Sequence, residues 1–586
     1  MSLNTELEPS QSLTENNQLD IRCVFRHVEG FYTKYFEHTT VEPTDQLDQL
    51  NVVYRDFMKL KSEESFMIWL GWLQRMTKTK SHIQQIHTSD ATLRSTVYFV
   101  APSDGTGSNN SPSAADARAF GDFSVGASGT DAMGFSRLCE TARRVFQARP
   151  TRMLLHGFQV CDSIMEMWVF DRSGAYSSHQ FDMVQRPDLV VKVMTSYGRM
   201  NDEEAGFTSF IQRDDLGSYV IFQGTYENET KRLYLEDKPI AAPGYLVRPG
   251  TTCYAARAPM SQTANLVVKF AWREEVIHRE RKLLELTQER KVWGVIKAFG
   301  WQDLSSIRGL REGLQFNESC CSTPTMANGT ASQESISPVS SLVTNKDSDP
   351  PFIDRTFSCI VTSPLGRPIN QFETITEFLK ACRDVAKALR SLYEDGNILH
   401  RDICIKNLII PVQQVDGEPN GVLIDLDSAL ELENGPARSG ELVGSEGFMA
   451  IGILTGDAHT YRHDLESLFY VFLWVAICKD RNHDDLESLN HQPQTSRLWG
   501  WCSTRFKVVS KNKLEDMSLE GFPRILEEFS TEFAHLKDLA RRLHQLLFPV
   551  RDGAVFTGTD TDEARIKELY DGVIGTFHEA ISSLKH

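Results

Sequence analysis

The sequence lacks any hydrophobic run long enough to cross a membrane. Its longest apolar stretch, LFYVFLWVAIC at residues 468–478, is well short of the ~20 residues that a membrane-spanning helix requires. The first twenty residues contain neither an apolar core nor a basic residue, so they are not typical of a secretion signal or a transit peptide. These absences predict an intracellular protein, in the cytoplasm or the nucleus, with no membrane partner.

Positive charge is also scarce. The 62 Lys and Arg residues are outnumbered by 79 Asp and Glu residues, which gives a formal net charge of −17. Nucleic acids and anionic membranes are bound by basic surfaces, so no nucleic-acid partner is expected. The 11 cysteines are odd in number and irregularly spaced, which favours reduced thiols over a disulfide framework.

Several enzyme motifs are missing as well. The chain contains no Gly-rich Walker loop ending in Lys-Ser/Thr, no His-Glu-x-x-His, no Cys-x-x-Cys and no Gly-x-Ser-x-Gly. The enzyme classes that these motifs identify are therefore left without support.

Three polar segments divide the 586-residue chain. Residues 1–20 are predicted to be a disordered leader, and residues 103–116 a low-complexity loop. Residues 317–351 are predicted to be a disordered insertion, because they are too long for an ordinary connection within a compact domain. The region at 21–150 is mixed in character, and its pattern assigns no fold.

The rest of the chain changes from β-like to helical. Residues 151–311 are dominated by short runs such as MEMWVFDRSG, PDLVVKVMTS and NLVVKFAW between turn residues, which predicts a β-rich lobe. Residues 352–510 are predicted to form a helical lobe, and residues 511–586 a helical tail. Apolar residues recur at intervals of three and four from Ile375 to Leu392, as in an amphipathic helix. We therefore predict an α+β fold with two lobes and an additional mixed α/β N-terminal region.

The most informative chemical motif is NILHRDICIKNLII at residues 397–410, where four polar residues interrupt an apolar run. Phosphoryl transfer from ATP needs a carboxylate that orients the acceptor hydroxyl, ligands for a divalent metal, and a cation on the phosphates. Asp402 is suited to the first task, and Asn407 offers a carbonyl oxygen to Mg²⁺. The run VLIDLDSA places Asp425 at a strand end as another oxygen ligand. The turn signal DGEPNG between them lets the three side chains converge.

These motifs resemble those of the fungal-type protein kinases, a divergent branch of the protein kinases. The resemblance rests on HRDICIKN, LIDLDSA, GSEGFMAIGIL, YRHDLESLFYVFLWVAI and, upstream, MWVFDRSGAYSS, and it covers roughly residues 140–510. It implies a two-lobed protein-kinase-like fold that binds ATP and Mg²⁺ between the lobes. It also implies transfer of the γ-phosphate to a Ser/Thr hydroxyl of a protein substrate. The motifs identify neither that substrate nor the oligomeric state.

Two lysines in the same local sequence, LVVK, are candidates for the cation on the phosphates. Lys269 is favoured because it follows LVRPGTTCYAARA, a turn in which Gly250 is the one glycine of the expected phosphate loop. Lys192 is instead interpreted as the end of an ordinary exposed strand. By the resemblance, Lys269 is the lysine that grips the α and β phosphates. Glu280 resembles its ion-pair partner, with Glu285 as the second choice.

The sequence departs from the family pattern in several places. Cys404 stands where many serine/threonine kinases have a lysine, and Lys406 is either its substitute or a plain surface lysine. Asp427 stands where a glycine is usual, and Gly452 where the family has a glutamate that pins the activation segment through an arginine. The poor phosphate loop and Gly452 keep a pseudokinase as an alternative. Because of Asp427, a small-molecule kinase of the aminoglycoside or choline type is a second alternative.

Arg401 and Asp464 complete the candidate site. Arg401 is typical of kinases regulated by phosphorylation, because a guanidinium can bind a phosphate on the activation segment, with Ser439 and Ser445 as candidate sites. It argues against a small-molecule kinase, whose motif usually has a glycine at that position. Asp464 resembles the buried aspartate that holds the catalytic loop, although a helix N-cap is the simpler interpretation.

Overall fold

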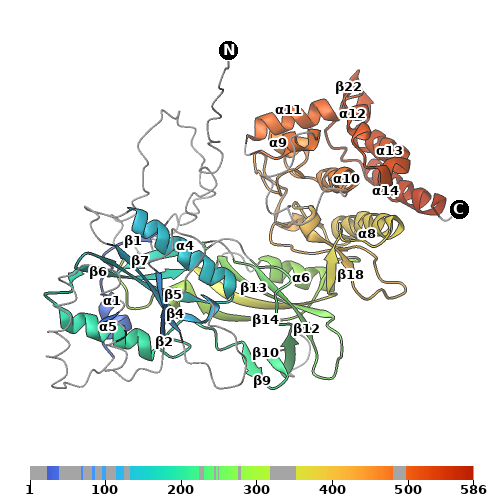
Figure 1. The fold of residues 1–586 in the computed structure, drawn as a ribbon. Helices are drawn as coiled ribbons and strands as arrows, with labels where there is room; N and C mark the ends of the chain where they lie inside the picture. Colours follow the sequence, from blue (N-terminus) through green and yellow to red (C-terminus); the bar gives the residue numbers. More distant parts are fainter. Residues whose placement is uncertain are drawn as a thin grey trace, which may run out of the picture.

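The structure is a computed structural model. It describes residues 23–38, 68–69, 71, 82–85, 96–100, 114–124, 132–223, 230–242, 246–247, 250–274, 279–316, 352–478, 496–503 and 505–584. The predicted leader at 1–20 and the predicted insertion at 317–351 lie outside the described residues, as does most of the predicted loop at 103–116. Figure 1 shows two sheets and a group of helices at the C-terminal end.

The N-terminal part of the chain forms an eight-stranded sheet. Its order is β1-β7-β6-β5-β4-β3-β2, with β8 paired to β6. Neighbouring strands are antiparallel except that β4 runs parallel to β5 and β1 parallel to β7. The strands are β1 (Val24–Phe25), β2 (His82–Gln85), β3 (Thr96–Val100), β4 (Ala117–Ser124), β5 (Leu154–Cys161), β6 (Ile164–Asp171), β7 (Gly174–Ser177) and β8 (Phe181–Asp182).

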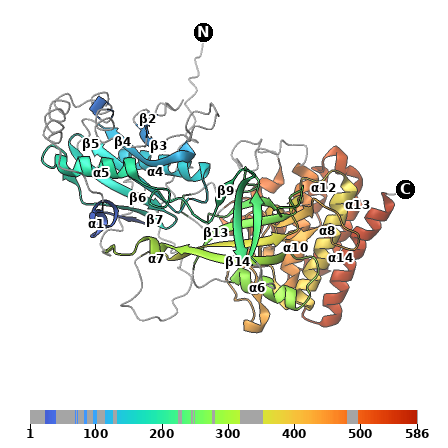
Figure 2. The ribbon, with the colours of Figure 1, turned by 90° about the horizontal axis from the view of Figure 1, so that it is seen from below.

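Helices pack on both faces of this sheet (Figures 1 and 2). Successive side chains of a strand point to opposite faces. Trp168 and Phe170 of β6 accordingly pack into the cluster that contains helix α4, whereas Met167 and Val169 pack into the cluster that contains α1 and α5. The helices of this part are α1 (Phe31–Phe36), the 3-10 turn η3 (Ala114–Asp116), α4 (Ala132–Ala148) and α5 (Pro187–Arg199).

Helix α5 corrects one prediction. The run PDLVVKVMTS was expected to be a strand that ends at Lys192, but it forms a helix from Pro187 to Arg199. Pro187 stands at the helix start, where its fixed φ and missing N–H are tolerated, and Asp188 complements the dipole of the first turn. One face of the helix buries Val190, Val193, Met194 and Tyr197 at helical spacing. That burial outweighs the weak preference of valine for strands.

A seven-stranded antiparallel sheet follows, in the order β14-β15-β13-β12-β11-β10-β9. Its strands are β9 (Gln212–Asp214), β10 (Gly217–Gln223), β11 (Thr230–Leu235), β12 (Thr252–Arg257), β13 (Leu266–Glu274), β14 (Lys297–Ser306) and β15 (Arg355–Ser363). Helix α6 (Arg279–Glu289) connects β13 to β14, and α7 (Ile307–Leu310) follows β14. This sheet and α6 make up the β-rich lobe.

The sheet topology places the boundary between the N-terminal region and the β-rich lobe elsewhere than at residue 151, where we expected it. Strands β5 to β8, within the predicted lobe at 151–311, belong to the N-terminal sheet. Conversely, β15 belongs to the β-rich lobe, although it lies inside the predicted helical segment at 352–510. Local alternation identifies a strand but not the strand that pairs with it, so the sequence could not place this boundary.

The helical lobe begins with α8, whose predicted apolar face is buried. Thr374 caps α8 by accepting a hydrogen bond from the Glu377 N–H at 3.1 Å. The helices are α8 (Ile375–Glu394), α9 (Ile451–Thr455), α10 (Tyr461–Cys478), α11 (Phe506–Asp516), α12 (Phe522–Glu527), α13 (Lys537–Leu547) and α14 (Glu563–Ser583). The 3-10 turns are η5 (Ile405–Asn407), η6 (Leu432–Asn434), η8 (Arg497–Trp501) and η9 (Thr531–Leu536).

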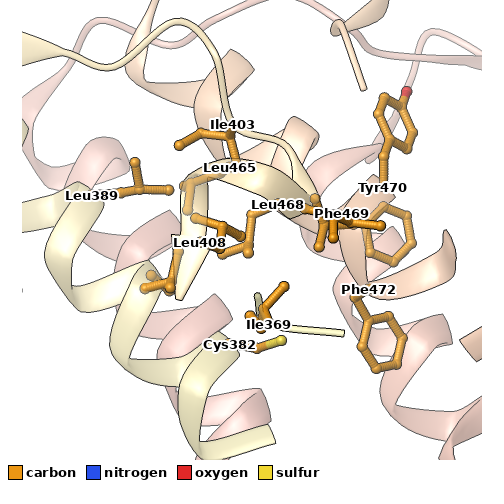
Figure 3. Packing of buried hydrophobic residues seen from close by; sticks show 14 of the residues in the cluster. Ile369, Cys382, Leu389, Ile403, Leu408, Leu465, Leu468, Phe469, Tyr470 and Phe472 are labelled. Atoms are coloured by element: carbon orange, nitrogen blue, oxygen red, sulfur yellow. The ribbon is translucent and has the colours of Figure 1, made fainter. Parts of the chain in front are cut away.

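Short strand pairs accompany these helices. They are β16 (Gly366–Pro368), β17 (Ile398–Leu399), β18 (Leu408–Pro411), β19 (Val422–Leu423), β20 (Leu430–Glu431), β21 (Val550–Arg551) and β22 (Ala554–Val555). Helix α10 runs through the centre of the lobe and is buried on all sides, and its charged residues Asp464 and Glu466 find their partners inside the lobe. Figure 3 shows Cys382 and Leu389 of α8 in the same cluster as Leu465, Leu468 and Phe472 of α10.

The predicted α+β fold with a β-rich and a helical lobe is confirmed, and the N-terminal region adds a mixed α/β sheet. A buried ion pair joins that sheet to the β-rich lobe. The Arg311 guanidinium donates to both carboxylate oxygens of Asp171, each at 2.8 Å, and both side chains are almost fully buried. Among the described residues, no helix is long and apolar enough to cross a membrane.

Candidate active site

The turn predicted to be catalytic lies between β17 and β18, and Asp464 holds its backbone. The two carboxylate oxygens of Asp464 accept hydrogen bonds from the backbone N–H groups of His400 and Arg401, each at 2.9 Å. His459 Nε2 lies 3.0 Å from the same carboxylate. Burial alone would raise the pKa of Asp464, but His459 and the other partners hold it below its usual value. Asp464 therefore fixes the turn, and its role goes beyond that of a helix cap.

Asp402 and Asn407 are joined within the turn. The Asn407 amide nitrogen donates to the Asp402 backbone carbonyl at 2.9 Å and to its carboxylate at 3.0 Å. An amide that donates through its nitrogen has its oxygen left to accept or to bind a metal. On the other side of the carboxylate, the Ser445 hydroxyl donates to Asp402 Oδ1 at 2.7 Å. Asp402 is thus oriented from both sides.

Asp425 follows β19 and lies beside the turn, since the Ile424 N–H donates to the Asn407 carbonyl at 3.0 Å. Its backbone has φ = 65°, a left-handed conformation that Asp tolerates better than most residues. The Asp425 carboxylate lies 2.9 Å from Lys269 Nζ. Burial would raise the pKa of Asp425, but the nearby ammonium lowers it to about 2. The carboxylate is therefore charged at neutral pH, as a metal ligand must be.

Lys269 links the two lobes. From β13 it reaches Glu280 of α6 at 2.9 Å as well as Asp425 of the helical lobe. Burial on its own opposes the charge, but the neighbouring carboxylates hold the pKa of Lys269 well above its usual value. The second-choice residues lie elsewhere: Lys192 stacks over the Tyr32 ring in the N-terminal part, and Glu285 pairs with Arg281 within α6.

Two charged residues that the sequence reasoning did not place in this network belong to it. Arg273 forms an ion pair with Glu280 and lies 3.8 Å from the Asp427 carboxylate. Asp427 also lies 3.6 Å from Lys269 Nζ. The signal for Arg273 was available, because residues four apart on a strand share one face and Lys269 and Arg273 have that spacing. The extra cation compensates for the extra carboxylate at the usual glycine position.

The carboxylates at the site fit a divalent cation. Oxygens of Glu280, Asp425 and Asp427 lie within 4.8 Å of one another, and Mg²⁺ takes hard oxygen ligands. Glu280 is engaged by both Lys269 and Arg273, which leaves the carboxylates of Asp425 and Asp427 as the better candidates in this group, while Asn407 stays a predicted ligand. Residues of the predicted type are therefore present for Mg²⁺.

The expected phosphate loop connects β11 to β12 and touches the N-terminal sheet. Arg172 Nη1 donates to the Leu246 carbonyl at 3.2 Å, and the Leu246 side chain is 2% exposed in the cluster that contains α4. Gly250 has φ = 58°, and a Cβ there would lie 3.2 Å from the Arg172 guanidinium. The neighbouring residue Cys253 pairs in register with Lys269. The loop thus ends beside Lys269, and Arg172 and Leu246 hold it against the N-terminal sheet.

The activation segment carries a carboxylate opposite Arg401. Arg401 Nη1 donates to Glu441 at 2.9 Å, and its Nε donates to the Ser428 carbonyl at 2.8 Å. Of the two candidate phosphorylation sites, Ser439 is exposed, whereas Ser445 is half-buried against Asp402. The position where a phosphate was expected to bind is occupied by Glu441.

Gly452 does not leave the end of the activation segment without an anchor. A Cβ at Gly452 would lie 2.5 Å from His463 Nε2, so the packing leaves no room for a glutamate. The adjacent N–H of Ile451 donates to Glu466 at 2.7 Å, and Glu466 pairs with Arg462 at 2.5 Å. A glutamate and an arginine thus anchor the end of the activation segment here too, but both, Glu466 and Arg462, lie on α10.

Cys404 and Lys406 differ in their surroundings. The Cys404 side chain is buried, and burial raises the pKa of its thiol to about 11. The Lys406 side chain is exposed. The position of the usual lysine is thus filled by a neutral side chain.

Similarity to known proteins points to one family. The family model described as fungal protein kinase matches residues 94–476, more than half of the chain. No curated protein matches the chain. A solved structure of vaccinia related kinase 3 is similar over 64% of this chain and 91% of its own, with 10% sequence identity and a TM-score of 0.35. The family assignment rests on the match to the family model alone.

Proposed function

Because the chain belongs to the fungal protein kinase family, we propose that it transfers the γ-phosphate of ATP, with Mg²⁺, to a serine or threonine hydroxyl of a protein. The observation that carries this proposal is the position of Lys269. Its ammonium lies 2.9 Å from both Glu280 of the β-rich lobe and Asp425 of the helical lobe. A cation fixed beside a metal-binding carboxylate is what ATP chemistry needs from a protein.

The residues of the chain divide the work. Asp402 orients the acceptor hydroxyl and accepts its proton, a role that requires a carboxylate within hydrogen-bond reach of that hydroxyl. Lys269 binds the phosphates and is positioned by Glu280, while Asn407 and Asp425 supply oxygen ligands. Mg²⁺, when bound, neutralises the charge that builds up on the phosphates. Catalysis is then positioning combined with electrostatic stabilisation.

The contact between Ser445 and Asp402 supports a hydroxyl acceptor. The Ser445 hydroxyl donates to Asp402 Oδ1 at 2.7 Å, so an alcohol side chain of this size reaches the carboxylate from the side of the activation segment. A serine or threonine of a protein substrate presents the same group. A tyrosine would have to place its hydroxyl several ångströms further from its backbone.

The proposal is tested by phosphate incorporation from γ-labelled ATP into dephosphorylated casein, with Mg²⁺ and with excess EDTA. We expect incorporation only with Mg²⁺, and phosphoserine or phosphothreonine after acid hydrolysis. Asp425→Asn is expected to abolish it, whereas Asp416→Asn, in the exposed hairpin between β18 and β19, should leave it unchanged.

Two results would contradict the proposal. ATP binding by the wild type without transfer to casein or to the chain itself would indicate a pseudokinase. Transfer to aminoglycosides or choline but not to protein would indicate a small-molecule kinase.

A further inference from the structure

Lys513 is the most unusual charged residue outside the network already described. It lies on α11 and is 0% exposed. Its ammonium donates to the backbone carbonyls of Gly447 at 2.9 Å and Met449 at 2.7 Å. The rings of Tyr470 and Trp501 lie 3.9 Å and 5.0 Å from it. The lysine is thus enclosed by two aromatic rings and the end of the activation segment.

Burial of this kind is unfavourable unless the charge is compensated. The hydrogen bonds of Lys513 go to neutral carbonyls rather than to a carboxylate. Burial consequently lowers the pKa of Lys513 to about 7, although Glu466 and Cys502 act in the opposite direction. A methionine or leucine would fill the same space without burying a charge, but could not donate to the two carbonyls. The presence of a lysine is explained if its ammonium is needed to donate to the two carbonyls.

We propose that Lys513 is a positioning residue that fixes residues 445–449 of the activation segment against Asp402, and so shapes the binding site for the acceptor. The proposal rests on the proposed kinase function. It names a residue of this site that neither the motifs nor the family match identified, since Lys513 lies beyond the matched residues 94–476.

The path from Lys513 to Asp402 is short. The carbonyls of Gly447 and Met449 flank Phe448, whose N–H donates to the Ser445 carbonyl at 3.1 Å. The hydroxyl of that same serine donates to Asp402. Moving the two carbonyls would therefore also move Ser445, whose side chain contacts the Asp402 carboxylate.

The middle of the segment combines the polar contacts of Lys513 with apolar packing, in which the Phe448 ring lies 5.5 Å from the Trp474 ring. Its near end is held by Ser445 on Asp402, and its far end by the Ile451 N–H on Glu466 at 2.7 Å. Gly447 has φ = 82°, and a Cβ there would lie 3.4 Å from Cys502 Sγ, so the backbone lies close to the helical lobe. Removing the ammonium would leave two buried carbonyls without their donor, which is costly.

The effect should fall on the acceptor and spare the nucleotide. The carbonyls that Lys513 holds belong to the segment beside Asp402. The ammonium and carboxylates that serve ATP are joined to each other across the lobes and have no contact with Lys513. A change at Lys513 should therefore separate the two substrates in their kinetics.

The test compares Lys513→Met with wild type and with Lys511→Met, an exposed lysine on the same helix. Steady-state phosphorylation of dephosphorylated casein should show a KM for casein raised, or kcat lowered, by about tenfold in Lys513→Met. The KM for ATP should stay within about twofold, and Lys511→Met should match wild type. Methionine is similar in length to lysine and keeps the space filled, and a thermal melt checks that the variant folds.

Amide hydrogen exchange measures the same contact without needing activity. A peptide covering residues 444–451 should exchange faster in Lys513→Met than in wild type, while a peptide covering β13 should not change. Equal exchange of residues 444–451 in the two proteins would overturn the proposal, and so would a KM for ATP that rises as much as the KM for casein. If the wild type transfers no phosphate at all, the kinase function fails, and the exchange rates alone decide whether Lys513 fixes the segment.

Discussion

The nucleotide side and the acceptor side of the proposed active site are held in different ways. On the nucleotide side, side chains of opposite charge bind one another directly across three elements. Two cations lie among three carboxylates within ion-pair distance, namely Lys269, Arg273, Glu280, Asp425 and Asp427. The loop that completes this side is held by the N-terminal sheet, through Arg172 and Leu246.

On the acceptor side, buried groups of the helical lobe bind the backbone. Asp464 accepts from two N–H groups of the catalytic turn, Glu466 accepts from one N–H of the activation segment, and Lys513 donates to two of its carbonyls. These interactions do not depend on the identity of the residues whose backbone they hold.

This difference, between ion pairs on one side and hydrogen bonds to the backbone on the other, predicts which substitutions each side should tolerate. The nucleotide side depends on a balance of charge, so removing one charge should affect ATP most. The acceptor side depends on hydrogen bonds from buried side chains of the helical lobe, so removing one of these side chains should affect the protein substrate most. The four predictions that follow test this division.

The largest effect is expected at Lys269. Lys269→Met removes the cation from the phosphates and leaves Glu280 and Asp425 without their shared partner, so kcat/KM for ATP should fall by about 10²–10³-fold. Lys192→Met, in the same LVVK context but on α5, is the matched control and should retain wild-type kinetics. Steady-state rates at varied ATP check both. An equal loss in the two variants would remove the basis for assigning the phosphate site to β13.

The second effect is on stability and depends on pH. The pKa of Lys513 is about 7 in the folded chain against a usual 10.5, so between these values the unfolded chain binds more protons. The free energy of unfolding of wild type should therefore rise with pH relative to Lys513→Met, by about 3 kcal/mol between pH 6 and pH 9. Urea denaturation at the two pH values measures it. A parallel pH dependence in both proteins would show that Lys513 titrates normally.

A smaller effect is expected where the phosphate loop meets the N-terminal sheet. Leu246→Ala removes a buried side chain that anchors the loop, and burial of this kind typically contributes about 2–5 kcal/mol. With the loop held less firmly, KM for ATP should rise about fivefold at an unchanged KM for the protein acceptor. Leu216→Ala, at a side chain that is 66% exposed, is the control. If KM for the protein acceptor rose instead, the nucleotide side and the acceptor side would not be held independently of each other.

The smallest effect is expected at Glu441. Its carboxylate is 41% exposed, and exposed ion pairs contribute little, so Glu441→Gln should lower kcat by about twofold to threefold. Glu446→Gln, exposed in the same segment, should change nothing. Because Glu441 already occupies Arg401, phosphatase treatment of the wild type should leave its activity intact. A large loss on dephosphorylation would show that a phosphate, rather than Glu441, completes this contact.

The parts of the site that lie within one turn were predictable from the sequence. Asp402 and Asn407 are five residues apart, and their contact follows from a local spacing. Asp425 and Lys269 could also be placed, since each ends or lines a strand with a recognisable pattern. The choice of Lys269 over Lys192 depended on the flanking turn, and the structure brings only Lys269 to Asp425.

The remaining parts depend on contacts between distant segments. Lys513 binds a carbonyl 64 residues away, and no spacing rule connects a lysine on a late helix to the activation segment. Likewise, Gly452 looked like a lost anchor because the sequence does not show that His463 fills its place or that Glu466 takes over its hydrogen bond. The strand predicted within PDLVVKVMTS at 187–196 was wrong because local valine content was given more weight than helical burial.

The central claim is that the catalytic turn at Asp402 performs phosphoryl transfer to a hydroxyl. The most direct measurement is incorporation of γ-labelled phosphate into dephosphorylated casein by wild type and Asp402→Ala, with Asp416→Ala as the exposed control. We predict transfer by wild type and by the control, a rate about 10³-fold lower in Asp402→Ala, and the same affinity for ATP in all three. Transfer by Asp402→Ala at the wild-type rate would contradict the claim.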